Sequence, residues 1–219
     1  MDPEVLRSYL PLYKEAFILT LETGWMGIAI AFAIGIVAAF ILHFRVPVLA
    51  KITSVYVELF RNTPLLVQLF FIYFALPKIG LSIPAKTCGA LGLGLLGGSY
   101  MAEGIRSGLD AIGKSQEESA LALGMSKRQM FMYVIFPEAL SISIPGIVAN
   151  VIFLLKETSV FSAISLMDLM FTAKDLIGLY YDTTEALVLL VVFYIIMLLP
   201  VSVIGSIIEK KARYRTLGV

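Results

Sequence analysis

Residues 16–42 read AFILTLETGWMGIAIAFAIGIVAAFIL, and Glu22 is the only charged residue among them. A helix needs about 20 consecutive, mainly apolar residues to cross the hydrocarbon core of a bilayer. Because no water in that core can satisfy free backbone groups, a crossing segment closes its hydrogen bonds internally. This stretch therefore predicts a membrane-spanning helix. It is too long for the apolar part of a signal peptide, so we expect it to be retained.

Other parts of the chain repeat this pattern. The further predicted spans cover about 52–76, 85–109, 130–155 and 186–208. We therefore expect an all-α integral membrane protein with about five transmembrane helices, lying within one domain over 16–209. Residues 1–15 are predicted to be an extracytoplasmic segment, and 210–219 a cytoplasmic tail.

The composition agrees with a membrane protein and excludes several other classes. Hydrophobic residues make up 59% of the chain and charged residues 15%, against about 25% charged residues in a typical soluble domain. The net charge of +1 provides no basic field for nucleic acid. One cysteine, Cys88, and one histidine, His43, provide neither a disulfide nor a recognisable metal site. We expect no metal and no cofactor in this chain.

Orientation is predicted from the basic residues, which gather on the cytoplasmic side of membrane proteins. If the N-terminus is outside, ten basic residues lie on the cytoplasmic side: Arg45, Lys51, Arg106, Lys114, Lys127, Arg128, Lys210, Lys211, Arg213 and Arg215. The opposite side then has Arg7, Lys14, Lys78, Lys86, Lys156 and Lys174. This imbalance predicts an outside N-terminus and a cytoplasmic C-terminus.

Glycine is concentrated in the predicted third span. Gly94 with Gly98, and Gly104 with Gly108, are spaced by four residues and so lie on one face of a helix. Small residues at this spacing allow neighbouring helices to approach closely. The pattern favours a crowded helix at the centre of a bundle, although glycine is also generally common in membrane helices.

Residues 108–115, GLDAIGKS, match the phosphate-binding pattern G-x-x-x-x-G-K-[ST]. That motif requires a preceding β-strand and a following helix whose amides hold the phosphate. Here a membrane helix precedes it, so we interpret the match as coincidental. Nucleotide binding by this chain is not expected.

The same region predicts a short capped helix over about 115–125. Ser115 with Glu118, and Ser126 with Gln129, both fit the capping-box spacing. Gly124 is placed where a left-handed residue ends a helix. We expect a helix of about two turns, too short to cross the membrane. It either packs on its own bundle or docks into a partner's groove.

Three elements of this loop resemble the signature of binding-protein-dependent ABC permeases, EAA-x3-G-x9-I-x-L-P. They are Glu118-Ser-Ala120, Gly124, and Val134-Ile-Phe-Pro137. The spacing agrees throughout, with Ser119, Val134 and Phe136 as mild departures. The resemblance covers about Phe17 to Arg213 and is greatest to the histidine- and glutamine-type branch of polar amino-acid permeases. The branch-specific segments are 58–68, 100–106 and 155–159.

The resemblance implies the fold and the partners. The fold would be a type I ABC importer transmembrane domain with a cytoplasmic coupling helix, in the bacterial cytoplasmic membrane. The chain would pair with a second copy or a homologous permease, receive an amino acid from an extracytoplasmic solute-binding protein, and be driven by ATPase subunits that bind the ATP. The resemblance also implies an ATPase-coupling role for Glu118, Ser119, Ala120, Leu121, Gly124 and Pro137, although Glu118 could serve as a cap only.

Charged and polar residues inside the predicted spans are candidates for the substrate path, because they are costly in lipid. A zwitterionic amino acid needs an anion for its ammonium group and donors for its carboxylate. Glu58 with Arg61, and Glu103 with Arg106, are three residues apart and could instead be structural ion pairs. The full set of candidates is Glu58, Arg61, Gln68, Tyr100, Glu103, Asn150, Lys156, Glu157 and Ser159.

Two other classes of membrane protein fit the sequence less well. A stand-alone, ion-coupled secondary transporter usually contains an internal repeat, and none is convincing here. A membrane-bound enzyme would need a catalytic set, which one histidine and one cysteine do not readily supply. We therefore expect a transport subunit without its own nucleotide site. The identity of the amino acid and the choice between homodimer and heterodimer stay open.

Overall fold

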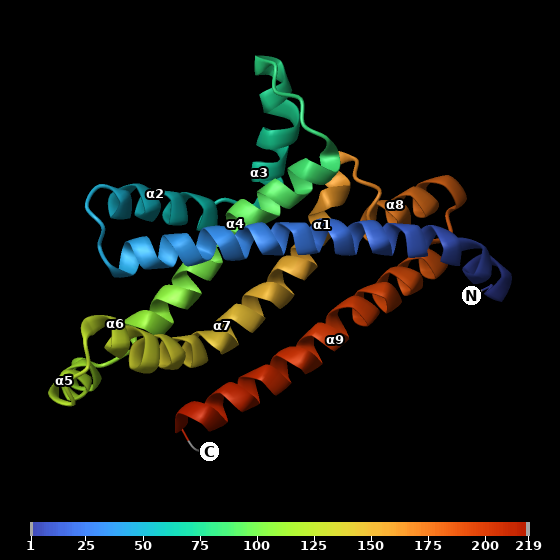
Figure 1. Ribbon diagram of the computed structural model, residues 1–219. Coiled ribbons are helices and arrows are strands. Elements are labelled where there is room, and N and C mark those ends of the chain that lie inside the picture. Colours follow the sequence, from blue (N-terminus) through green and yellow to red (C-terminus); the bar gives the residue numbers. More distant parts are fainter. Residues whose placement is uncertain (1, 218–219) are drawn as a thin grey trace.

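The computed structural model describes residues 2–217, and helices dominate it (Figure 1). Helix α1 (Pro3–His43) has 41 residues, which at 1.5 Å per residue is about 62 Å of helix. Residues 3–15 of the expected extracytoplasmic segment are therefore part of α1, and the side of the membrane on which they lie stays a prediction. The Asp2 carboxylate caps it by accepting from the Glu4 amide at 2.8 Å. The Tyr13 hydroxyl then fixes this end to the last helix, α9 (Thr183–Leu217), by donating to the Ala186 carbonyl.

The second predicted span is not one continuous helix. Helix α2 (Leu49–Arg61) ends before a break, after which α3 (Leu65–Phe70) turns away by 104°. A π-helical turn, η1 (Phe71–Ala75), and a 3-10 turn, η2 (Leu76–Ile79), complete this arm. Pro64 explains the break, because it lacks an amide hydrogen and disfavours helical geometry in the residue before it.

Helix α4 (Ala85–Asp110) is the central helix, packed against α1, α2 and α7. Its glycines allow this packing, as the sequence predicted. A Cβ at Gly94 would lie 2.5 Å from Ile30 of α1, and one at Gly98 would lie 2.7 Å from Ile34. Gly108 does the same toward α7, where the added carbon would lie 2.5 Å from the Ala139 carbonyl oxygen. Glycine therefore sets how closely the helices approach.

A short helix, α5 (Lys114–Ala122), protrudes at one end of the molecule, at the lower left of Figure 1. After it come α6 (Lys127–Met130), a π-helical turn η3 (Phe131–Ile135) and α7 (Phe136–Glu157). The fourth predicted span is therefore helical throughout, with a change of helix type just before Pro137. This change fits the proline, which cannot donate a helical hydrogen bond.

Two elements between α7 and the last helix were not predicted. They are a 3-10 helix, η4 (Thr158–Ile164), and α8 (Leu169–Tyr180). Both are shorter than the run of about 20 apolar residues by which a membrane span is recognised in a sequence. The last helix, α9 (Thr183–Leu217), continues past the predicted span end at 208, so the expected tail over 210–219 is helical at least to Leu217.

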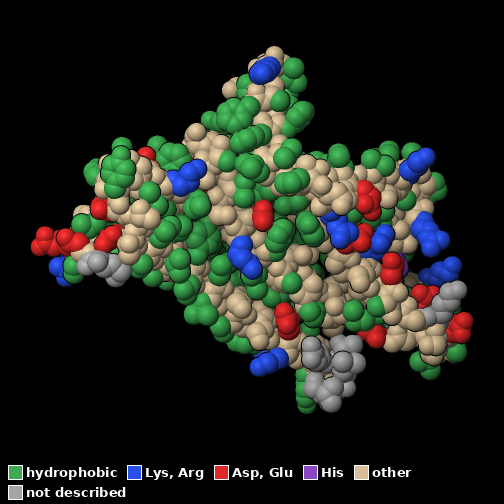
Figure 2. All heavy atoms as spheres, turned by 180° about the vertical axis from the view of Figure 1, so that it is seen from behind, with side chains coloured by type: hydrophobic (Ala, Val, Ile, Leu, Met, Phe, Trp, Pro, Cys, Tyr) green, Lys and Arg blue, Asp and Glu red, His purple; other side chains and the backbone are tan. Residues whose placement is uncertain are grey.

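Within residues 2–217, length and composition identify three helical stretches able to cross a membrane: Pro3–His43, Lys127–Ile164 and Thr183–Ala212. The bent arm over Leu49–Ile79 would make a fourth. Helix α4 matches the remaining predicted span in position, but its many glycines make it less apolar than the others. Large apolar side chains remain exposed on the outer helix faces, including Val37, Val55 and Ile195. Figure 2 shows such side chains over much of the surface.

Candidate functional site

The start of α5 differs from the sequence prediction. Ser115 was expected to be the N-cap, with Glu118 completing a capping box. Instead Gly113 holds the extended N-cap position without a side-chain cap, and the helix begins at Lys114. Ser115 therefore lies inside the helix, where its carbonyl accepts a hydrogen bond from the Ser119 hydroxyl at 2.7 Å. The predicted first capping box is wrong because the helix starts earlier than its capping residue.

The end of α5 is as predicted. Gly124 adopts φ +78°, a left-handed conformation that L side chains disfavour. Its amide donates to the Leu121 carbonyl at 2.9 Å, and the Met125 amide donates to the Ala120 carbonyl at 3.2 Å. This pair of bonds is the Schellman motif. It satisfies two carbonyls at the end of the helix and reverses the chain tightly.

The second predicted capping box is confirmed. The Ser126 hydroxyl accepts from the Gln129 amide at 3.3 Å, and the Gln129 side chain accepts from the Ser126 amide at 2.9 Å. Helix α6 therefore begins at a defined residue, immediately after the turn that ends α5. The link between the two helices is short and hydrogen-bonded.

The side chains of α5 divide into a covered and an uncovered set. Ala120 is buried, whereas Glu118 and Ser119 are exposed. Leu121 is 47% exposed, and Leu123 just beyond the helix is 79% exposed. Exposed leucines beside a carboxylate, at a polar end of the molecule, are suited to docking against another protein. This supports a partner-facing helix.

A cavity of about 360 Å³ lies at the break between α2 and α3. Arg61 ends α2, Tyr100 projects from α4, and Glu157 ends α7. All three line the cavity, together with Asn62, Thr63, Pro64, Leu65, Leu66, Leu96, Phe153 and Val160. The fold thus brings together three predicted path residues that are distant in sequence, with a cation and a carboxylate among them.

Arg61 is positioned by partners on α4. Its guanidinium lies 5.4 Å from the centroid of the Tyr100 ring, a cation–π distance. It also pairs with the Glu103 carboxylate at 3.4 Å, and Glu103 pairs with Arg106 at 3.2 Å. Glu103 and Arg106 therefore form the ion pair that their spacing allows, and a role for them in the substrate path stays a prediction. The expected pair between Glu58 and Arg61 is wrong, because Arg61 turns to α4 while Glu58 accepts from Asn62.

Gln68 supports the helix break. Its side-chain amide donates to the carbonyls of Phe60 and Thr63 at 3.1 Å and 2.9 Å. The Phe60 carbonyl lies in the last turn of α2, where carbonyls lack partners within the helix. Gln68 is 7% exposed and does not line the cavity. It holds the break in place and so shapes the cavity wall.

The remaining predicted path residues lie around the cavity but not on its wall. The Asn150 amide donates to the Tyr100 carbonyl at 3.2 Å and joins α7 to α4 behind the wall. Ser159 is half-buried in η4. Lys156 is exposed and is not among the residues that line the cavity. Of these two adjacent residues, only Glu157 therefore lines the cavity.

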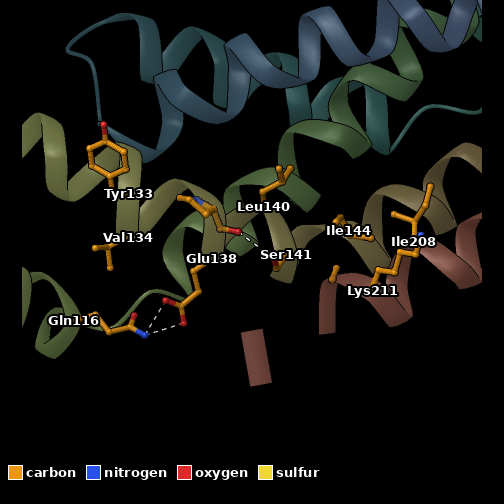
Figure 3. A pocket seen from close by; sticks show the side chains of 11 residues that line it. Gln116, Tyr133, Val134, Glu138, Leu140, Ser141, Ile144, Ile208 and Lys211 are labelled. Atoms are coloured by element: carbon orange, nitrogen blue, oxygen red, sulfur yellow. Dashed lines mark hydrogen bonds between the residues drawn. The ribbon is translucent and has the colours of Figure 1, made fainter. Parts of the chain in front are cut away.

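A second hollow, of about 690 Å³, lies at the end of the molecule that carries α5. It opens between η3, α7 and α9, and Pro137 forms part of its wall. Figure 3 shows Gln116 of α5 and Glu138 of α7 facing each other at one side, with Ile208 and Lys211 of α9 opposite. Sequence reasoning did not select Gln116 or Glu138. No local pattern connects two polar residues on different helices.

Known proteins share this arrangement. Residues 16–214 match the family of binding-protein-dependent transport system inner membrane components. The chain belongs to this family. It is a permease subunit of an ABC importer, and the predictions of a type I importer fold and a multi-pass membrane protein are confirmed. Because the chain belongs to this family, the alternative of a stand-alone, ion-coupled secondary transporter is excluded.

Individual members of the family are similar to this chain over most of their length. The probable glutamine ABC transporter permease GlnP of Bacillus subtilis (strain 168) is 35% identical over 172 residues, which cover 78% of this chain and 79% of that protein. The arginine transport system permease ArtQ of the same organism is 31% identical over 205 residues, covering 93% and 94%. A crystal structure of an amino acid ABC transporter with histidines superposes with a TM-score of 0.89 at 32% identity, covering 96% of this chain and 99% of that one.

Proposed function

We propose that this permease imports a polar amino acid, delivered by an extracytoplasmic solute-binding protein and driven by ATPase subunits that grip α5. The functional unit is a dimer with a second copy or a similar permease. The N-terminus faces outside and the C-terminus faces the cytoplasm. The observation that carries the substrate class is the cavity lined by both Arg61 and Glu157.

The chemistry of this cavity suits a zwitterion. The Arg61 guanidinium can donate to a carboxylate in a planar fork, which Lys cannot do. The Glu157 carboxylate can accept from an ammonium group. The rings of Tyr100 and Phe153 lie 5.2 Å apart between centroids, tilted by 58°, and provide an apolar wall. Charged side chains within membrane-spanning segments are costly and commonly functional, so two opposite charges on one cavity favour a role in binding.

The shape of α5 supports the coupling role. It has a defined end at Gly124, one buried residue at Ala120, and exposed Glu118, Ser119 and Leu121 on its open side. A short helix with fixed ends can transmit a displacement that a loose loop would absorb. ATP binds to the partner subunits in this proposal, and this chain contributes no nucleotide site.

Uptake by a reconstituted complex tests the proposal. The tagged permease and its co-purifying ATPase are placed in liposomes with ATP inside, and the binding protein and radiolabelled amino acids are added outside. We expect accumulation of a polar amino acid only when ATP and binding protein are both present, and no ATP hydrolysis by the purified permease alone. Accumulation of an apolar substrate would contradict the substrate class. Accumulation without ATP, driven by a proton or sodium gradient, would contradict the whole proposal.

A further inference from the structure

A direct contact joins α5 to α7. The Gln116 side-chain amide donates to both oxygens of the Glu138 carboxylate, at 2.8 Å and 2.9 Å. Both residues are half-buried, at the edge of the 690 Å³ hollow (Figure 3). Hydrogen bonds to an ionised carboxylate are stronger than those between neutral groups. The two helices are therefore tied by a short, directional link.

Other connections between α5 and the helix bundle are few. Among the α5 side chains that the structure describes, only Gln116 forms a hydrogen bond or ion pair with another helix. The chain itself reaches α7 through the left-handed turn at Gly124, the four residues of α6 and the π-helical turn η3. A π-helical turn within a helix commonly marks a place of adjustment. The hydrogen bonds between Gln116 and Glu138 connect α5 directly to α7, without these intervening segments.

Helix α7 connects this link to the cavity. Glu138 lies in its first turn and Glu157 is its last residue, so the two carboxylates lie at opposite ends of one 22-residue helix. At 1.5 Å per residue that helix is about 33 Å long. One element, which contains Pro145 between the two carboxylates, therefore connects Glu138 to the cavity wall at Glu157 and can carry a displacement between them.

We infer that Gln116 and Glu138 are positioning residues for transport: their contact carries the displacement of α5 into α7 and hence to Glu157. This inference rests on the proposed function, because it requires an ATPase that moves α5. It adds a specific mechanical contact that lies outside the EAA-type signature. It predicts that breaking the contact separates ATP hydrolysis from uptake.

Charge exchange tests the contact in the reconstituted complex. Gln116→Glu sets two carboxylates against each other, and Gln116→Glu with Glu138→Gln restores a carboxylate–amide pair in reverse. We expect Gln116→Glu to lower the amount of amino acid imported per ATP hydrolysed by about tenfold, within the usual range of coupling effects. ATP hydrolysis should continue. The double variant should recover most of the wild-type ratio. Gln129→Glu makes the same change at an exposed position outside α5, where a glutamate also preserves the capping box, and should keep the wild-type ratio.

Several outcomes decide the question. A wild-type ratio in Gln116→Glu would overturn the inference, and so would a double variant as defective as the single one. If Gln116→Glu prevents assembly with the ATPase, recovery of both assembly and uptake in the double variant supports the contact, and failure to recover overturns it. A wild-type complex without ATP-driven uptake would instead defeat the proposed function, so the two failures are distinguishable.

Discussion

Arg61 and Glu157 line one cavity of about 360 Å³, although the first ends α2 and the second ends α7. The break between α2 and α3 belongs to the same site, because Asn62, Thr63 and Pro64 form part of the cavity wall. Arg61 is further oriented by Tyr100 and by Glu103. The two opposite charges are therefore held on separate helices that could move relative to each other.

Removing the negative charge from the cavity should impair transport. We expect Glu157→Gln to lower ATP-driven uptake by about tenfold or more, because a hydrogen bond to a charged group contributes about 1.5–3 kcal/mol. Lys156→Gln is the matched control. It removes a charge from the adjoining residue, which is exposed and does not line the cavity. Initial rates of radiolabelled uptake measure both. Equal loss in the two variants would contradict the assignment of the cavity.

The left-handed residue at the end of α5 should be sensitive to substitution. Gly124→Ala forces an L side chain into φ +78°, at a cost of roughly 1–2 kcal/mol. Gly124→Asn should cost less, since Asn tolerates this conformation better. We expect the alanine variant to retain less ATPase in co-purification than the asparagine variant. The reverse order would show that this backbone geometry does not position α5.

The contact between α4 and α7 should depend on Gly108. An alanine there would place its Cβ 2.5 Å from the Ala139 carbonyl oxygen, so Gly108→Ala should destabilise the chain by about 1–3 kcal/mol, as overpacking does. Gly104→Ala, one turn earlier, would only reach the Asn150 amide at 3.5 Å. Thermal unfolding in detergent compares the two variants. Similar midpoints for both would contradict the close approach of these helices.

Stability should depend on pH through Asp168, which lies between η4 and α8, outside the spans. One oxygen accepts from the Phe171 amide at 2.9 Å, the other has no hydrogen-bond partner, and burial raises the pKa of the carboxyl from 3.8 to about 7. The folded protein then keeps a proton that the unfolded chain releases. The stabilisation is therefore full below about pH 4 and is lost as the pH rises to about 7.

Asp168→Asn tests this dependence, because the amide oxygen can still accept from Phe171 but does not titrate. The difference in unfolding midpoint between variant and wild type should grow in the variant's favour from pH 4 to 7, and then level off. A difference that stays constant over this range would show that Asp168 does not hold the proton.

The sequence predicted the helical class well because long apolar runs have few alternatives to a membrane helix. It also predicted the Schellman end at Gly124 and the cap at Ser126, where local residue chemistry determines the geometry. It missed the break at Pro64, because the apolar residues on both sides read as one run. It also misplaced the start of α5. Ser115 fits the pattern of an N-cap, but Gly113 occupies the N-cap position and the helix begins two residues earlier than the pattern predicts.

The candidate site was predictable only in part. Charge and polarity within the predicted spans selected Arg61, Tyr100 and Glu157, along with several residues to which the fold gives other positions. Gln68, for example, bonds to backbone carbonyls at the helix break. The contact between Gln116 and Glu138 has no local signature, because it joins two helices whose packing is determined by the rest of the bundle.

Access to α5 tests the central claim, that an ATPase grips this helix from the cytoplasm. Leu123 is 79% exposed, and Leu123→Cys in a chain with Cys88→Ser places a single thiol there. We predict that a membrane-impermeant maleimide labels this thiol in inside-out vesicles stripped of ATPase, and that added ATPase protects it. Labelling from the outer face of intact cells, or labelling that bound ATPase does not reduce, would contradict the account.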